Sequence, residues 1–276
     1  MSFDLRFFSV TPNQSHQWFS VANPTNASQA VGYIKSVLHN LNTPGAITNG
    51  DTFDGALTQN EDLSAVEYLP TNSSGDPVFS FAVARLRIKA ASKTTISPVR
   101  VFFRLFQAAS TVSNFIEVGT GEGTYRWGTN GTTGHKIPLL GVQTDQNGNL
   151  EYVTIPCFAT ERVNLTTPTD MNQQTDPPNA VPITTTAGSE LDTFFGCWLD
   201  VNQAGPGNNF LIATPPSSQS QWDGPWPGTL SINGVIQNAP HQCLIAEIRY
   251  DDTPIPTNAT TATSDKLCLL YTSRCV

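Results

Sequence analysis

The chain of 276 residues carries a net charge of −8, and only 13% of its residues are charged, about half the share usual in globular domains. This composition favours short strands with polar loops over long helices, and the acidic balance excludes the basic surface that a nucleic-acid or anionic membrane partner needs. Because no apolar run approaches the roughly 20 residues that span a bilayer, we also expect no membrane insertion.

The first residues of the chain, MSFDLRFFSV, include Asp4 and hold no sustained apolar core. They therefore do not resemble a secretory signal. The sequence indicates a cytoplasmic protein, a protein exported by a route that reads no N-terminal signal, or a misplaced gene start.

The N-terminal segment, residues 1–75, is predicted to contain a strand at residues 5–10 and one amphipathic helix. The helix is indicated by apolar residues with the i, i+3, i+4, i+7 spacing of one helix face, at Ala30, Tyr33, Ile34, Val37, Leu38 and Leu41. Ser28 is placed to cap its start, and Pro44 with Gly45 ends it. We expect the apolar stripe to pack on the rest of the fold.

Residues 78–107 predict two β-strands joined by a polar turn, and the fold is organised around them. Their apolar and polar side chains alternate with the period of two that half-buried strands show. One face of the second strand, for example, carries Val99, Val101, Phe103 and Leu105. The pair is either a hairpin or two neighbouring strands of one sandwich. The arginines on the opposite faces could form an anion site, but we favour a solvated outer face.

Five further apolar segments predict strands, and the Asn147-Gly148 dipeptide between the first two is typical of a tight hairpin turn. These segments are residues 136–142, 150–158, 193–201, 230–236 and 242–250. Residues 164–189 and 202–229 are predicted as long polar loops. The predicted fold class is therefore mainly β: an antiparallel β-sandwich, immunoglobulin-like or jelly-roll, with one N-terminal amphipathic helix.

Composition also predicts the domain boundaries. Residues 1–75 pack on a β-sandwich domain at 76–252, and the Pro- and Thr-rich residues 253–267 form a linker to a missing C-terminal part. Residues 268–276, CLLYTSRCV, differ abruptly from what precedes them and resemble a translated sequencing adapter, the transposase end sequence. We expect this tail to be non-native and exclude it from the fold.

No residue pattern predicts a catalytic site, a metal site or a cofactor. Outside the tail, Cys157, Cys197 and Cys243 lie in apolar segments without a CxxC pair, so we expect them to be buried as small apolar side chains. A disulfide from Cys197 to either of the others stays open, as does a metal site with His241. The histidines adjoin no nucleophile motif, and no two carboxylates are placed for glycoside hydrolysis.

Four aromatic residues and one acid in Gly-, Pro- and Asn-rich loops are the candidate ligand-binding residues. They are Tyr125, Trp127, Trp222, Asp223 and Trp226. Rings exposed on rigid loops can stack on sugars or hold a protein partner. In the alternative that we favour, Pro225 and Pro227 pack on Trp226 and only stiffen the loop.

Six short segments together resemble a family of uncharacterised bacterial proteins. They are VFFRLFQ (101–107), IPLLG (137–141), TIPCF (154–158), FFGCWLD (194–200), HQCLIAEI (241–248) and SDKL (264–267). Members of this family are generally longer, and the resemblance implies no activity. The strand pattern is also similar to immunoglobulin-like modules of bacterial surface and appendage proteins, although a shared fold does not imply a shared function.

These observations favour a non-catalytic structural or interaction module of a longer bacterial protein or assembly. Its expected partner is a protein or further copies of the chain. One alternative is a carbohydrate-binding module that uses the loop aromatics to hold a glycan. A second is a hydrolase with an unidentified carboxylate or histidine site.

Overall fold

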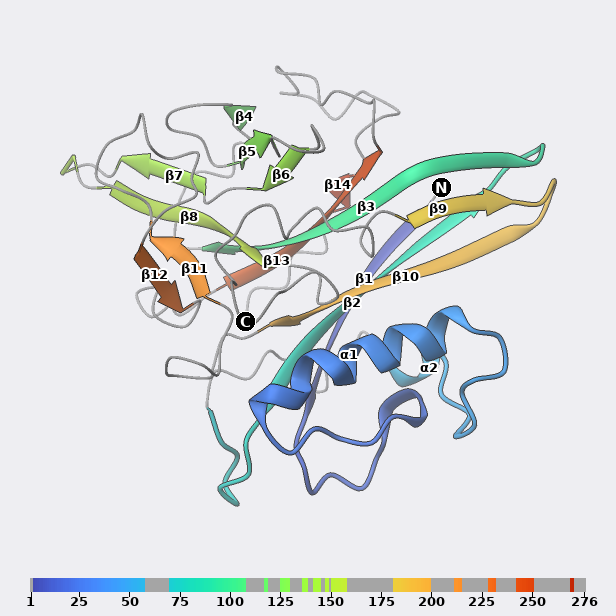
Figure 1. Cartoon of the computed structure of the whole chain (residues 1–276), viewed down its shortest axis with the longest axis horizontal. Helices are drawn as coiled ribbons and strands as arrows, with labels where there is room; N and C mark the ends of the chain where they lie inside the picture. The colour runs from blue at the N-terminus through green and yellow to red at the C-terminus, as the bar shows by residue number, and fades with distance from the viewer. Residues whose placement is uncertain are drawn as a thin grey trace. The chain divides into compact units, whose positions relative to one another are not determined.

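The computed structural model is rich in β-structure, and the prediction of a mainly β chain with antiparallel sheets is confirmed (Figure 1). The structure describes residues 2–57, 70–107, 117–118, 125–129, 136–138, 141–144, 147–148, 150–157, 181–199, 211–214, 228–231, 242–250 and 269–270. The chain forms two compact units, each described by itself. Unit 1 comprises Met1–Thr95, Ala159–Glu161 and Ile183–Asn209, and unit 2 comprises Ile96–Phe158, Arg162–Pro182 and Phe210–Val276.

Unit 1 is built on an antiparallel sheet in the order β1-β2-β10. The strands are β1 (Ser2–Val10), β2 (Phe79–Lys89) and β10 (Glu190–Leu199). Phe81 at the centre lies opposite Phe8 on one side and Trp198 on the other, so these three side chains share a face. The strand predicted at residues 5–10 is confirmed and starts earlier, at Ser2.

Helices cover the Phe81 face of this sheet. The long helix is α1 (Ala27–Asn42), with the 3-10 turn η1 (Trp18–Ser20) before it and the short α2 (Phe53–Ala56) after it. The predicted apolar stripe is confirmed, because Ala30, Ile34 and Val37 are fully buried. Gly196 lets α1 approach, since a Cβ there would lie 3.1 Å from Leu38 Cδ2 and 2.9 Å from the carbonyl oxygen of Ala82.

The start of α1 differs from the prediction. The residue before the helix is Asn26, and Ser28 lies inside the first turn, where its hydroxyl donates to the Asn26 side-chain oxygen at 2.6 Å. Gln29 instead reaches back, and its side-chain oxygen accepts from the Thr25 amide at 2.8 Å. This bond follows the logic of a capping box, in which the third helical residue returns to the chain before the helix.

The opposite face of the β1-β2-β10 sheet is apolar and buried as well. Leu5, Leu86, Phe195 and Cys197 lie on it, each no more than 4% exposed. The predicted burial of Cys197 as a small apolar side chain is therefore confirmed. A sheet with two buried faces needs a layer on each.

Unit 2 contains a sheet in the order β14-β13-β3-β8-β7. The strands are β3 (Thr94–Gln107), β7 (Gly141–Thr144), β8 (Leu150–Cys157), β13 (Gln242–Tyr250) and β14 (Leu269–Leu270). Phe103 and Val101 lie opposite Ala246 and Ile248, and all four are buried. The predicted inward faces of residues 99–105 and 242–250 are thus confirmed there. The two residues of β14 belong to the tail predicted as non-native.

Smaller pairings complete the described strands. β4 (Glu117–Val118) pairs in parallel with β5 (Tyr125–Thr129), which pairs with β6 (Lys136–Pro138), and β11 (Leu211–Thr214) pairs with β12 (Gly228–Ser231). β9 (Val181–Thr185) pairs with the start of β3, where the hydroxyl oxygens of Thr95 and Thr184 are 2.9 Å apart. β9 and β11 fall in the stretches predicted as loops, because four or five residues with Thr and Pro show too little alternation to identify a strand.

The two strands of residues 78–107 do not form a hairpin. β2 pairs with β1 and β10, whereas β3 pairs with β13, β8 and β9. Three of their four arginines are covered: Arg100 and Arg104 are 2% and 0% exposed, and Arg85 on the central strand β2 is mostly covered. The prediction of a solvated arginine face was therefore wrong for these three residues, whereas the Arg87 side chain is 38% exposed. In unit 1, two carboxylates and the Phe53 ring contact Arg85.

Candidate functional site

The structure describes only two of the five predicted ligand-binding residues. Tyr125 and Trp127 lie in β5 and not in a loop, which corrects the prediction. A loop was predicted because the flanking residues are rich in glycine and the strand has only five residues, too few to show a clear alternation. Trp222, Asp223 and Trp226 lie outside the described residues, as does His241. The predicted sugar-binding or partner-binding role of these residues stays a prediction.

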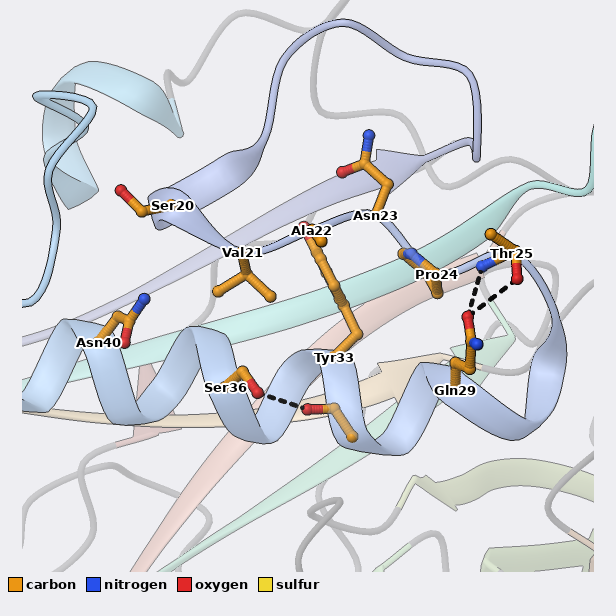
Figure 2. A pocket seen from close by; sticks show the side chains of 11 residues that line it. Ser20, Val21, Ala22, Asn23, Pro24, Thr25, Gln29, Tyr33, Ser36 and Asn40 are labelled. Atoms are coloured by element: carbon orange, nitrogen blue, oxygen red, sulfur yellow. Dashed lines mark hydrogen bonds between the residues drawn. The ribbon is translucent and has the colours of Figure 1, made fainter.

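The best-defined candidate site is an open pocket of about 770 Å³ between α1 and the segment before it (Figure 2). One wall is a polar side of α1, and the other wall is residues 20–25. The helix residues of the first wall are Gln29, Gly32, Ser36 and Asn40. None of the lining residues carries a charge. The volume falls in the range of about 300–1,000 Å³ that small-molecule sites occupy.

The wall formed by residues 20–25 begins at a strained turn. Phe19 and Ser20 have φ angles of 52° and 62°, in the left-handed region that costs about 1 kcal/mol or more for residues with a side chain. Burial holds Phe19 in place, since its ring is 0% exposed and packs edge-on to Phe8. Asn40 on α1 also donates to the Phe19 carbonyl at 2.8 Å, so the wall is tied to the helix opposite.

Hydrogen bonds of Asp51 and Ser20 also stabilise the turn at Phe19 and Ser20, by joining it to residues 48–51. The Asp51 carboxylate accepts from the Phe19 amide at 2.7 Å and lies 3.2 Å from His16 Nε2. The Ser20 hydroxyl oxygen accepts from the amides of Thr48 and Asn49 at 2.8 and 3.1 Å. The segments around residues 16–20 and 48–51 therefore brace one another, and the pocket wall is preformed.

Tyr33 forms the floor of the pocket. Its side chain is 4% exposed, and its ring lies 5.0 Å from Phe81 and 6.4 Å from Phe8. Figure 2 shows the Tyr33 side chain crossing from α1 to the segment at Ala22. Burial, and to a lesser degree the charge of Asp51, raises the pKa of the Tyr33 hydroxyl well above its ordinary value. The hydroxyl is therefore a hydrogen-bond donor at any physiological pH.

Two buried polar atoms at the pocket have no hydrogen-bond partner among the described residues. One is the Tyr33 hydroxyl oxygen, and the other is the side-chain oxygen of Asn23. The Asn23 amide nitrogen is already used, since it donates to the carbonyls of Gln14 and His16 at 2.9 and 3.2 Å. An unsatisfied buried group costs about 1–3 kcal/mol. Both atoms are buried from solvent, and Figure 2 shows the Asn23 side chain pointing away from α1.

Gly32 leaves open space in the helix wall. No atom lies within 4 Å of the position that a Cβ would take there, so the fold itself does not need a glycine at this point. A helix-interior glycine costs about 1 kcal/mol relative to alanine. What the missing side chain provides is room in the pocket.

A second cluster of polar residues lies on the helix-bearing face of the sheet and has a structural role. Arg85 lies 2.6 Å from Asp54 and 3.3 Å from Asp4, with its guanidinium 4.6 Å from the centre of the Phe53 ring. The hydrogen bond from Arg85 lowers the pKa of Asp54 against the opposing effect of desolvation, and nearby arginine charges add to the lowering. Asp54 is thus a counter-ion that stays charged at neutral pH.

Sequence reasoning placed Tyr33 in the helix core and did not identify the pocket. The available signal was a tyrosine beside a glycine in an otherwise aliphatic stripe, at Tyr33 and Gly32. Among the residues that the structure describes, no three His, Cys, Asp or Glu side chains are grouped to hold a metal ion. None of the helices in the described ranges has the length and apolar character to cross a membrane.

In comparisons with known proteins, no protein-family model, curated protein or solved structure matches the chain. Its function is therefore inferred from the geometry of the pocket.

Proposed function

We propose that the chain is a non-catalytic structural or interaction module of a larger protein or assembly, with a protein or further copies of the chain as its partner. The observation that carries this proposal is the preformed, uncharged pocket beside α1. An open pocket with a braced wall is suited to holding another molecule.

The carboxylates on the helix-bearing face of the sheet and at the η1 turn support a structural role. Asp54 and Asp192 are hydrogen-bonded to arginines at 2.6 Å, and Asp51 holds the Phe19 amide. A general acid needs a pKa near the working pH, whereas the pKa of Asp54 is lowered. These carboxylates serve the fold and leave the uncharged pocket as the feature available for binding.

We also propose that the architecture is a β-sandwich, immunoglobulin-like or jelly-roll in type. The support is the β1-β2-β10 sheet, whose face opposite the helices is as apolar and as buried as the face beneath them. A second layer over Leu5, Leu86 and Phe195 accounts for that burial. Leu86→Ala should cost about 2–5 kcal/mol of stability if a second layer buries this side chain, and an unchanged urea midpoint would contradict that layer.

The competing function is a hydrolase, and the His16–Asp51 pair is the described arrangement that favours it. The experiment is an assay with aryl esters, aryl glycosides and aryl phosphates, comparing the purified chain with His16→Ala. We expect both proteins to give the rate of buffer alone. Turnover by the natural chain that His16→Ala removes would overturn the non-catalytic proposal.

The partner class is tested separately by sedimentation velocity from low to high micromolar concentration. Assembly with further copies predicts a sedimentation coefficient that rises with concentration. A chain that stays monomeric throughout would contradict self-assembly and leave a different protein as the proposed partner.

A further inference from the structure

We propose that Asn42, the last residue of α1, closes the edge of β10 against pairing with a second copy of the chain. The order β1-β2-β10 leaves β10 at one end of the sheet, with no further strand beside it among the described residues. Open strand edges pair readily with other chains, and folded proteins protect them in several ways. Asn42 does not line the pocket, so this inference is independent of the proposed function.

The Asn42 side chain takes the place of a neighbouring strand at one residue of β10. Its oxygen accepts from the Phe194 amide at 2.9 Å, and its nitrogen donates to the Phe194 carbonyl at 3.1 Å. In an antiparallel sheet, a residue directly opposite can make this same pair of bonds. Asn42 therefore satisfies both backbone groups that Phe194 presents at the edge.

Further contacts hold the two residues in this arrangement. The Asn42 nitrogen also donates to the Leu38 carbonyl at 2.9 Å, so both of its hydrogens are used and the side chain is tied to the end of the helix. The Phe194 ring lies 5.3 Å from the Phe53 ring of α2. Since α1 packs along β10, the cap is part of the folded unit.

The bonds of Phe194 also show which backbone groups of β10 face outward. The amide and carbonyl of one residue point to the same side of an antiparallel strand, and successive residues alternate between the two sides. Because Phe194 points away from β2, Asp192 does so too, whereas Thr193 points to β2. Next to Asp192 lies Leu191, whose 37% exposure makes it the exposed large apolar residue of the described ranges. This end of β10 therefore offers a second strand both backbone groups and an apolar side chain.

Pairing of two copies through β10 requires the backbone groups that Asn42 occupies. In a two-fold antiparallel pair centred on Asp192, Phe194 of each copy lies opposite Glu190 of the other. With both Phe194 residues capped, only the central Asp192 residues could exchange hydrogen bonds. A strand pair this short is not stable by itself, so one side chain in each copy is enough to prevent the association.

The cap is tested first by amide hydrogen exchange of the natural chain, with each rate divided by its intrinsic value. The Phe194 amide should exchange at least about threefold more slowly than the outward-facing Asp192 amide, as expected for one neutral hydrogen bond. In Asn42→Ala at low concentration, exchange at Phe194 should speed up by about the same factor, while Thr193 should change less. Equal corrected rates at Phe194 and Asp192 in the natural chain would overturn the proposal.

Association is tested by sedimentation velocity of Asn42→Ala at high micromolar concentration, where it should sediment faster than the natural chain. Asn40→Ala is the matched control, because Asn40 donates to the Phe19 carbonyl at 2.8 Å. This control also removes a side-chain hydrogen bond of α1 but leaves β10 capped, so it should sediment like the natural chain. Adding Leu191→Lys to Asn42→Ala should restore the sedimentation of the natural chain, since a lysine at a strand edge discourages pairing.

The proposal is overturned if Asn42→Ala sediments like the natural chain, or if Asn40→Ala associates as strongly as Asn42→Ala. It is also overturned if the double variant with Leu191→Lys stays associated, since the contact then lies away from β10. Should Asn42→Ala fail to fold, the exchange rates of Phe194 and Asp192 in the natural chain still decide the question. The module proposal is unaffected by these results, because every variant is compared with the natural chain at the same concentration.

Discussion

Arg87 on β2 donates two hydrogen bonds to Asp192 on β10, from Nε at 2.6 Å and from Nη2 at 2.7 Å. The two residues lie directly opposite each other in the register of the sheet. This paired geometry matches the planar guanidinium to the carboxylate and raises the pKa of Arg87 above its already high ordinary value. It also joins two segments that are 105 residues apart in the chain.

We expect Asp192→Ala to lower the free energy of unfolding by about 1 kcal/mol, the upper end for a pair exposed to solvent on one side. The Arg87 side chain is 38% exposed, so water screens part of the interaction. Urea denaturation gives the change. Glu190→Ala is the control, since Glu190 lies 3.4 Å from Lys89 with both side chains more than half exposed, and it should cost less than about 0.5 kcal/mol. Equal losses would contradict a special role for the Arg87–Asp192 pair.

Asp54 predicts a dependence of stability on pH. Its folded-state pKa is lowered, so its stabilisation is complete above the unfolded value of about 3.9 and is lost as the pH falls through the folded value. Urea midpoints of the natural chain and Asp54→Asn should differ at neutral pH and converge below about pH 4. A difference that stays constant on acidification would exclude this carboxylate as the cause.

Two glycines should respond in opposite ways to the same substitution. Gly196→Ala places a Cβ 2.9 Å from the Ala82 carbonyl oxygen and 3.2 Å from Ile34 Cδ1, and overpacking of this kind costs about 1–3 kcal/mol. Gly32→Ala meets no atom within 4 Å and should stabilise the helix by up to about 1 kcal/mol. Thermal melts measure both. A melting temperature that Gly196→Ala leaves unchanged or raises would show that the approach of α1 to β10 is looser than described.

Phe103→Ala should cost about 3–5 kcal/mol, as expected for a fully buried phenylalanine. Leu191→Ala is the comparison, because Leu191 is 37% exposed on β10, and it should change stability much less. Urea denaturation of both variants decides the point. An unchanged midpoint for Phe103→Ala would contradict the inward face of β3.

Regular patterns explain which parts of the fold were predictable. The α1 stripe and the alternation in β2, β3 and β13 are dense enough to identify each element and its buried face, as Ile34, Phe103 and Ala246 show. The pairing of β2 with β10 was not predictable, because an adjacent strand across a short turn is the commoner partner. Arg85 was mistaken for a solvated residue because its carboxylate partners lie far away in the sequence.

The pocket could not be predicted for a related reason. It depends on the left-handed turn at Phe19 and Ser20. Neither phenylalanine nor serine favours positive φ, so the sequence does not predict this turn. The turn is held by Asp51 and Thr48, about thirty residues later in the chain, and a sequence pattern does not show that contact. Only the tyrosine in the helix stripe gave a local sign.

The position of β2 between β1 and β10 has a consequence for synthesis on the ribosome. Arg87 emerges 105 residues before Asp192, and at about 5–20 residues per second this interval lasts about 5–20 s. During that time β2 can pair with β1 but leaves its other edge open, and an open strand edge invites association between nascent chains. A chaperone that binds the newly made N-terminal half should therefore raise the yield of folded protein more than one added after release.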